Sequence, residues 1–249
     1  MTPPPPPKKA TKPRTSKRAA EPNVTAPRLP VTLVVGTDTS VGKTWITCAL
    51  AKALKAAGQQ VIAVKPFETG CGLTPGIPED GELLAQATGQ AEPRQALVRL
   101  KSPLAVAVAA DQEEVTIDYE AVLSKVREYA RPDVFLLVEG VGGLLAPVTW
   151  SDNALDMAHS LNARVLVVAS DRLGTINHTL LTLRVLKAEK LPILGVVLNQ
   201  PAEPDESSPS NAGAISRLAN TDSVVRVPHM DDPDLAAEAV KEVAGWLLP

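Results

Sequence analysis

The stretch VVGTDTSVGKTWITCAL, residues 34–50, joins a Val-rich run to a glycine-bearing turn and then to a segment with helical apolar spacing. The usual phosphate-binding loop has four residues between its glycines, followed by Lys and Ser or Thr. Here five residues separate Gly36 from Gly42, and Lys43 and Thr44 follow. Because a strand-like run precedes the turn and a helix-like segment follows it, the stretch predicts a phosphate-binding loop that is one residue longer than usual.

Each part of this predicted loop has a role in binding a nucleotide. The helix N-terminus and successive backbone N–H groups cradle phosphate. Lys43 reaches the β- and γ-phosphates, and the Thr44 hydroxyl completes a Mg²⁺ shell. The residues predicted to bind the nucleotide here are Gly36, Thr37, Asp38, Thr39, Ser40, Val41, Gly42, Lys43 and Thr44.

The composition of the chain sets limits on its class. Of 249 residues, 45% are apolar, which is enough for one large α/β domain, whereas the 3% of aromatic residues argues against a module that stacks nucleic-acid bases. No apolar run approaches the ~18 residues of a membrane span. We therefore expect a soluble, cytoplasmic protein that binds neither nucleic acid nor membranes. Cys48 and Cys71 are far apart in the sequence and predict neither a disulfide scaffold nor a zinc site.

The N-terminal segment differs in kind from the rest of the chain. The first thirty residues are Pro-rich and hold seven Lys or Arg against one Glu, a charge of +6, whereas the remainder carries −9, and these sum to the net −3. Such a segment has too few apolar residues to pack. We predict a disordered basic arm over residues 1–28 and a single folded domain over residues 29–249.

Strand-like and helix-like segments alternate along the predicted domain. Their order predicts an α/β fold of the P-loop NTPase type, with a mainly parallel sheet covered by helices on both faces. A Pro/Ser-rich stretch, residues 200–210, is interpreted as a loop insertion. The predicted strands are residues 31–35, 61–65, 133–139, 164–169, 193–199 and 223–227, and the predicted helices are residues 43–57, 118–130, 153–161, 176–189 and 233–248.

Polar residues stand where several predicted strands end, and in parallel sheets this is the edge at which ligands bind. Lys65 is either a structural cation or a charge that faces the substrate. Glu139, in VEGVGG (residues 138–143), either binds metal as a Walker-B acid or makes structural hydrogen bonds. Asn199 is not followed by the Lys-x-Asp of a GTPase, so ATP is the favoured nucleotide.

These motifs together resemble the dethiobiotin synthetase family. The resemblance rests on GTDTSVGKT (residues 36–44), Lys65-Pro66 with Thr69-Gly70, VEGVGG, LGTINHTLLT (residues 173–182) and LNQ (residues 198–200). It covers most of residues 31–249 and excludes the basic arm. The longer loop is typical of this family, which explains the extra residue.

The resemblance implies an ATP-dependent ligase that acts on 7,8-diaminopelargonic acid and CO₂. One amine takes up CO₂ as a carbamate, ATP phosphorylates the carbamate, and the other amine closes the cyclic urea of dethiobiotin. The implied catalytic residues are Lys65, Lys43 and Thr39, with Lys65, Thr39 and Thr69 beside the carbamate. Thr44, Asp80 and Glu139 are the implied Mg²⁺ ligands, although Asp80 is alternatively a helix cap.

The resemblance also implies where the two ends of the bound molecules lie. Asn199 meets the adenine, and Val227, Pro228 and His229 close over it. The family is typically a homodimer in which the substrate carboxylate is bound by the partner's helix start. Free N–H groups there favour an anion on physical grounds as well. In this sequence that segment is Leu173, Gly174, Thr175, Ile176 and Asn177.

Other classes with the same type of fold are disfavoured. Switch ATPases of the partition or septum-positioning type resemble KGGxGKT and need a signature lysine, but Asp38 holds that position here. An anion does not stabilise a transferring phosphoryl group. Amidotransferring cobyrinic-acid synthetases normally carry a further glutaminase domain, for which this sequence is too short.

Overall fold

The computed structural model describes residues 31–248. The predicted basic arm, residues 1–28, lies outside the described residues. Among the described helices, none combines the length and the apolar character that a membrane crossing requires.

The described chain is built around a six-stranded sheet in the order β2-β5-β1-β6-β7-β8. Every neighbouring pair in this sheet is parallel, which confirms the predicted fold class. Side chains of β1 are buried at all six positions, as expected for a strand that helices cover on both faces. The strands are β1 (Val31–Gly36), β2 (Gln60–Val64), β5 (Val134–Gly143), β6 (Arg164–Ser170), β7 (Ile193–Asn199) and β8 (Val224–Val227).

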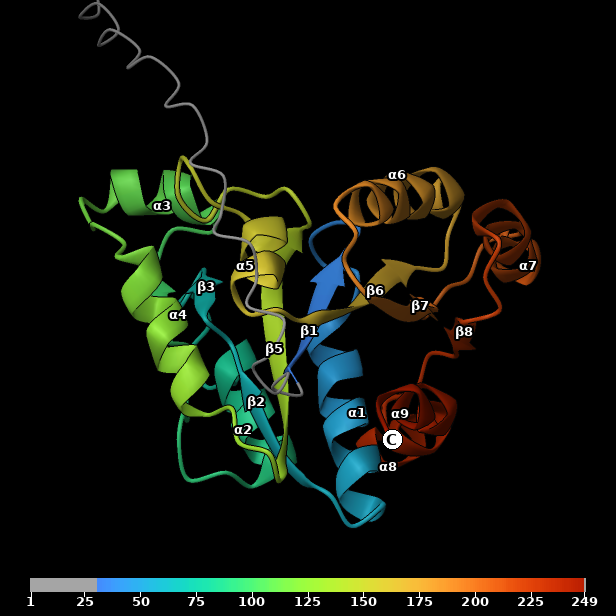
Figure 1. Ribbon diagram of the computed structural model, residues 1–249, viewed down its shortest axis with the longest axis horizontal. Coiled ribbons are helices and arrows are strands. Elements are labelled where there is room, and N and C mark those ends of the chain that lie inside the picture. Colours follow the sequence, from blue (N-terminus) through green and yellow to red (C-terminus); the bar gives the residue numbers. More distant parts are fainter. Residues whose placement is uncertain (1–30, 249) are drawn as a thin grey trace, which may run out of the picture.

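Helices cover both faces of this sheet (Figure 1). One face packs against α1 (Lys43–Ala56), α2 (Asp80–Thr88), α8 (Pro233–Ala239) and α9 (Lys241–Leu247). The core on the other face contains side chains from α3 (Val106–Gln112), α4 (Tyr119–Glu128), α5 (Ala154–Ser160), α6 (Thr175–Ala188) and α7 (Ser208–Ala219). Figure 1 shows α1 beside α8 and α9, so the C-terminal helices pack on the same face as the helix that follows the phosphate loop.

The position of β1 explains where the site forms. After β1 the chain runs first to β2 and β5 on one side and then to β6, β7 and β8 on the other. The order therefore reverses at β1, and ligands of such sheets bind outside the carboxyl ends of the strands at this point. The loop between β1 and α1 lies at this switch point.

The structure differs from the predicted elements in several places, among them α3, which was not predicted, and β5, which runs past the predicted end at residue 139. A second, two-stranded parallel sheet of β3 (Phe67–Thr69) and β4 (Val98–Leu100) was not predicted, because three-residue strands leave too little periodicity to recognise. The predicted insertion, residues 200–210, ends inside a helix, since α7 begins at Ser208 with a proline in its first turn. The predicted closing helix over residues 233–248 is two helices that meet at Val240.

Candidate functional site

The loop between β1 and α1 has the backbone conformation of a phosphate cradle. Gly42 immediately precedes α1 with φ +92°, and a Cβ on it would lie 2.1 Å from the side-chain Nδ2 of Asn199. A Cβ on Gly36 would lie 2.5 Å from the Asp38 carbonyl oxygen. Both glycines are therefore required, one for a left-handed conformation and both for close approach. The loop is anchored to the sheet because the N–H of Thr37 donates to the carbonyl of Val168 at 2.9 Å.

A cavity of about 300 Å³ opens at this loop. It is bounded by the loop itself, by the residues that follow β2, by the start of α2 and by the end of β5. Most of its lining comes from residues that the sequence singled out. The lining residues are Thr39, Ser40, Gly42, Lys43, Thr44, Lys65, Glu68, Thr69, Asp80, Val141 and Gly142.

Lys65 is the central charge of this cavity. It follows β2, is only 3% exposed, and its Nζ donates to Glu139 Oε1 at 2.5 Å and to Asp80 Oδ2 at 2.7 Å. Burial by itself lowers the pKa of Lys65, but the carboxylates of Glu139 and Asp80 outweigh it and raise that pKa. Lys65 is therefore a fixed ammonium held between two acids.

The carboxylate of Glu139 is only partly satisfied by its neighbours. Oε1 also accepts the Thr44 hydroxyl at 2.7 Å, whereas Oε2 is buried without a hydrogen-bond partner in the described chain. A buried oxygen without a partner is costly unless a further ligand completes it. Asp80 places another oxygen beside the same ammonium, and burial, which raises its pKa, is outweighed by Lys65, which lowers it. Hydroxyl and carboxylate oxygens are the ligands that Mg²⁺ prefers, so Thr44, Asp80 and Glu139 fit a magnesium ion.

Lys43 supplies a second buried ammonium at the same cavity. It is 6% exposed, and its Nζ donates to the carbonyl of Asp38 at 3.2 Å. Burial, and then the nearby charge of Lys65, lower the pKa of Lys43 to about 8. An anion at the loop would relieve both effects, so the unliganded loop favours phosphate.

Comparison with known proteins places this arrangement in a family. A family model described as an AAA domain matches residues 31–237. The chain is 41% identical over 209 residues to the ATP-dependent dethiobiotin synthetase BioD of Anaeromyxobacter dehalogenans strain 2CP-C. That alignment covers 83% of this chain and 92% of the relative. The chain is 37% identical over 216 residues to the ATP-dependent dethiobiotin synthetase BioD of Aquifex aeolicus, covering 87% and 96%. This chain belongs to the dethiobiotin synthetase family. The resemblance stated from the motifs is confirmed.

Two solved structures with the same fold belong to other classes of protein. The Pyrococcus furiosus cell division ATPase MinD superposes with a TM-score of 0.52 at 19% identity, covering 88% of this chain and 98% of that chain. A plasmid partition protein of Borrelia burgdorferi superposes equally well, at 14% identity and with 87% and 96% covered. At such low identity the likeness establishes the fold and nothing about activity.

None of the residues predicted to meet the base lines the cavity, and one of them, Asn199, contacts the loop. Asn199 ends β7 and donates from Nδ2 to the carbonyl of Val41 at 3.2 Å. Val227 is buried at the end of β8, whereas Pro228 and His229 are exposed. In this dethiobiotin synthetase family member, the amide of Asn199 is thus held against the phosphate loop itself.

The predicted anion-binding turn before α6 is partly exposed, with Thr175 buried, and it does not line the cavity at the phosphate loop. Leu173 is 81% exposed, and none of residues 173–177 lines the cavity. Two of the N–H groups in this turn are not free: that of Leu173 donates to Asp205 Oδ2 at 2.7 Å, and that of Thr175 donates to the carbonyl of Arg172 at 3.0 Å. Asp205 lies in the stretch interpreted as a simple insertion. Within residues 31–248, the N–H groups of Ile176 and Asn177 make no hydrogen bond outside the helix.

A buried acid that the sequence reasoning missed ties this turn to the segments predicted to meet the base. Asp171 is fully buried, and its two carboxylate oxygens accept from Asn211 Nδ2 and Arg226 Nε, each at 2.9 Å. Its N–H donates to the carbonyl of Asn199 at 2.8 Å. Each partner comes from a distant part of the sequence, so no local pattern marks Asp171.

Three residues lining the cavity were not among the predicted site residues. Val141 and Gly142 belong to the glycine-rich end of β5, which continues to Gly143 instead of stopping at the acid. A Cβ on Gly142, whose φ is +63°, would lie 2.9 Å from Ala146. The third is Glu68, whose position three residues after Lys65 is the available sequence signal.

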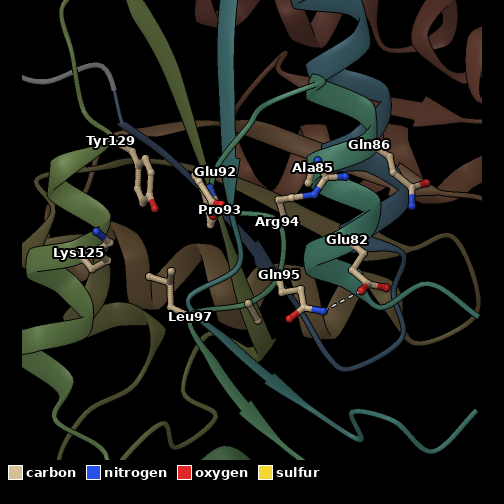
Figure 2. A pocket seen from close by; sticks show the side chains of 11 residues that line it. Glu82, Ala85, Gln86, Glu92, Pro93, Arg94, Gln95, Leu97, Lys125 and Tyr129 are labelled. Atoms are coloured by element: carbon tan, nitrogen blue, oxygen red, sulfur yellow. Dashed lines mark hydrogen bonds between the residues drawn. The ribbon is translucent and has the colours of Figure 1, made fainter.

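A larger cavity, of about 740 Å³, lies elsewhere, between α2, the segment before β4 and the end of α4 (Figure 2). Figure 2 shows Lys125 and Tyr129 facing the segment that carries Arg94, while Gln95 donates to Glu82 at 2.9 Å. Its lining mixes both signs of charge and includes none of the predicted site residues. The smaller cavity at the phosphate loop, which gathers the buried charges, is therefore the candidate site.

Proposed function

We propose that the protein is an ATP-dependent ligase that carboxylates 7,8-diaminopelargonic acid with CO₂ and closes the ureido ring of dethiobiotin, releasing ADP and phosphate. The observation that carries this proposal is Lys65. It places a second buried ammonium, in addition to Lys43 of the loop, in the cavity where phosphate is expected. A simple nucleotide hydrolase needs only the loop lysine, whereas an anionic acceptor facing the γ-phosphate needs a cation of its own.

The proposed reaction, which the family implies, gives each of these side chains a role. One substrate amine adds to CO₂ to form a carbamate, whose negative charge Lys65 holds beside Thr39 and Thr69. A carbamate oxygen then attacks the γ-phosphorus and ADP leaves, so the product of this step is a carbamic-phosphoric anhydride. The second amine attacks the carbonyl carbon of the anhydride, closing the five-membered ring and expelling phosphate. Lys43 neutralises charge on the nucleotide side, and positioning with charge neutralisation governs phosphoryl transfer.

Thr44, Asp80 and Glu139 are the residues proposed to hold Mg²⁺. When bound, the ion supplies positive charge against the β- and γ-phosphates. Support comes from the buried, unpartnered Oε2 of Glu139 and from the all-oxygen donor set. The proposed nucleotide contacts are the backbone of residues 36–44 together with Asn199, Val227, Pro228 and His229 at the adenine.

We further propose a homodimer in the cytoplasm, in which the substrate carboxylate binds across the interface. The turn that would bind it, Leu173 to Asn177, does not line the cavity of its own subunit, and Leu173, Gly174 and Asn177 in it are exposed. The free N–H groups of Ile176 and Asn177 are at the positive end of α6, which favours an anion. Leu173 offers the carboxylate no free N–H, because Asp205 accepts it, so its exposed side chain could add only apolar contact with the substrate. The folded body, residues 29–249, is proposed to act as one domain without the arm.

The switch-ATPase alternative is not favoured by the loop geometry. Asp38 stands at the position of the signature lysine, is exposed, and accepts the N–H of Thr39 with its own side chain at 2.7 Å. It supplies no cation to a transferring phosphoryl group. The likeness to MinD therefore extends to the fold and stops there.

One assay tests the proposed function. Purified protein is incubated with 7,8-diaminopelargonic acid, bicarbonate, Mg²⁺ and ATP, and dethiobiotin and phosphate are followed together. We expect equal amounts of the two products and little phosphate without the diamine. ATP hydrolysis that ignores the diamine, and that DNA or membranes stimulate, would overturn the proposal in favour of the switch class.

A further inference from the structure

We propose that Glu68 is a positioning residue for the metal site: its carboxylate holds the start of α2 so that Asp80 faces Lys65 and Glu139. This inference rests on the proposed function, in which Asp80 is a magnesium ligand. Glu68 itself is not a ligand in this proposal, because its oxygens face backbone N–H groups.

The contacts of Glu68 are specific to the first turn of α2. Oε1 accepts the N–H of Asp80 at 2.6 Å, and Oε2 accepts the N–H of Gly81 at 3.1 Å. Glu68 is only 7% exposed, and burial is the main reason that its pKa is raised. A buried carboxylate is costly, and it is retained here by a pair of hydrogen bonds that its two oxygens receive from successive residues.

The other end of this link is rigidly attached to the strand segment that carries Lys65. The carbonyl of Lys65 accepts the N–H of Leu97, and the carbonyl of Pro66 accepts the N–H of Val98, each at 3.0 Å. Glu68 then lies in β3, opposite Arg99 of β4. Glu68 therefore fixes the backbone of Asp80 relative to the backbone of Lys65. The 11 residues between Glu68 and Asp80 include the whole connecting loop.

That loop does little to place Asp80. Residues 72–78 are all exposed, and they include glycines with positive φ at positions 72 and 76. A second anchor next to Asp80 is the bidentate ion pair of Glu79 with Arg99, in which Nε and one terminal nitrogen of Arg99 donate to the two Glu79 oxygens at 2.9 and 2.7 Å. This pair holds the residue that precedes α2. Glu68 instead accepts the N–H of Asp80 itself, so it is the contact that bears directly on the backbone of the proposed ligand.

Close packing at Gly81 completes the alignment. A Cβ on Gly81 would lie 2.3 Å from the backbone nitrogen of Ala96 and 2.7 Å from the carbonyl carbon of Gln95. The start of α2 is therefore pressed against the segment that leads into β4. The hydrogen bonds of Glu68 hold the start of α2 close to β3. This close approach is possible because Gly81 has no side chain.

The experiment measures metal affinity directly, without turnover. Mn²⁺ replaces Mg²⁺ as the probe, and its binding to the full-length protein with saturating ADP is followed by electron paramagnetic resonance. Removing a group that orients a metal ligand typically weakens metal affinity about 10- to 100-fold. We expect losses in this range for Glu68→Ala and for Glu68→Asp, because the shorter Asp keeps the charge but does not reach both N–H groups. Glu68→Gln should lose less, since its amide oxygen still accepts one N–H.

This series separates position from charge. If Glu68 acted only by its negative charge, Glu68→Asp would bind Mn²⁺ like the wild type and Glu68→Gln would be as weak as Glu68→Ala, and that order would overturn the inference. Gly81→Ala gives a second test when a Glu68 variant fails to fold. It keeps every charge and polar group but displaces the helix start, so it too should weaken Mn²⁺ binding, and unchanged affinity there would count against the proposal.

Two control variants complete the design. Glu113→Gln alters another carboxylate that accepts a backbone N–H, that of Ser102 at 2.7 Å, and should leave Mn²⁺ affinity unchanged. Asp80→Asn reports the loss expected for the ligand itself. A loss for Asp80→Asn without one for Glu68→Asp overturns the positioning role alone. If neither variant loses Mn²⁺ affinity, Asp80 is not a metal ligand and the inference is overturned. The proposed function is tested separately, by the assay of dethiobiotin formation.

Discussion

Replacing Lys65 by Gln removes the ammonium that lies between Glu139 and Asp80 and leaves two acids facing each other. Removing one partner of a buried ion pair costs about 3–5 kcal/mol of stability. The Glu139 side chain is fully buried, but that of Asp80 is 40% exposed and keeps some water, which places Lys65→Gln near the lower end, at about 3 kcal/mol. Mg²⁺ should restore part of this loss, because a divalent cation then neutralises the same carboxylates.

The effect of Lys65→Gln on catalysis should be separate from any effect on ATP. Loss of one group that stabilises transition-state charge lowers kcat by about 10² to 10³. Lys65 belongs to the segment after β2 and Lys43 to the loop, so ATP affinity measured without metal should stay nearly unchanged in Lys65→Gln and fall in the control Lys43→Gln. Lys65→Arg should not recover full activity, because a planar guanidinium does not replace a compact ammonium in a buried site.

The assays for this variant are urea unfolding with and without Mg²⁺, calorimetric ATP affinity, and dethiobiotin formation at saturating ATP. One combination of results would refute the reasoning. If ATP affinity collapses while turnover at saturating ATP survives, Lys65 is a nucleotide ligand or a structural cation, and its role beside the carbamate is wrong. Unfolding that neither Lys65→Gln nor Mg²⁺ alters would show that the ion pair carries no stability.

Three further predictions follow from the site and the sequence. Thr44→Ala and Glu139→Gln should each weaken the Mg²⁺ dependence of turnover, and the double variant should cost less than the sum of the single ones, since both groups serve one ion; strict additivity in a double-mutant cycle would contradict this. Because burial lowers the pKa of Lys43 to about 8, the unliganded loop loses its positive charge above that pH. ATP affinity should therefore weaken as the pH rises from about 8 to 10 in the wild type and stay flat in Lys43→Gln, as calorimetry at several pH values would test. Deleting residues 1–28 should leave kcat and the thermal midpoint unchanged, and a large fall in either would show that the arm contacts the body.

The parallel sheet and the loop were predictable because each requires particular residue types at neighbouring positions of the sequence. Strands buried on both faces appear as Val- and Leu-rich runs, and the helices between them keep a regular apolar spacing. The loop adds glycines at positions where a side chain would collide with the backbone or with Asn199. Local physics dictates the residue at each of these positions, so the sequence is sufficient.

Strands of only three residues are too short to show a recognisable alternation of apolar and polar residues. β3 and β4 have three residues each, and they exist because the backbone after Lys65 pairs with a segment about thirty residues later. The break at Val240 divides two short helices that both pack against α1, and no local pattern marks it. The start of α7 at Ser208 is different, because the proline in its first turn is a local signal that the interpretation as an insertion did not use.

The residues of the candidate site fall into the same two groups. Some stand in a sequence motif, and others are recognised only by their tertiary contacts. Lys43, Thr44 and Glu139 stand in patterns that chemistry constrains over a few neighbouring positions, so the sequence locates them. Asp80 follows a loop with several acids nearby, and only the structure shows that its carboxylate lies 2.7 Å from Lys65 Nζ. Glu68 is less visible still, since its partners are backbone N–H groups, which every non-proline residue possesses and which no sequence pattern reveals. A residue that acts on the main chain of another element is therefore found from the structure, and the metal affinity of Glu68→Asp is the measurement that decides whether it acts at all.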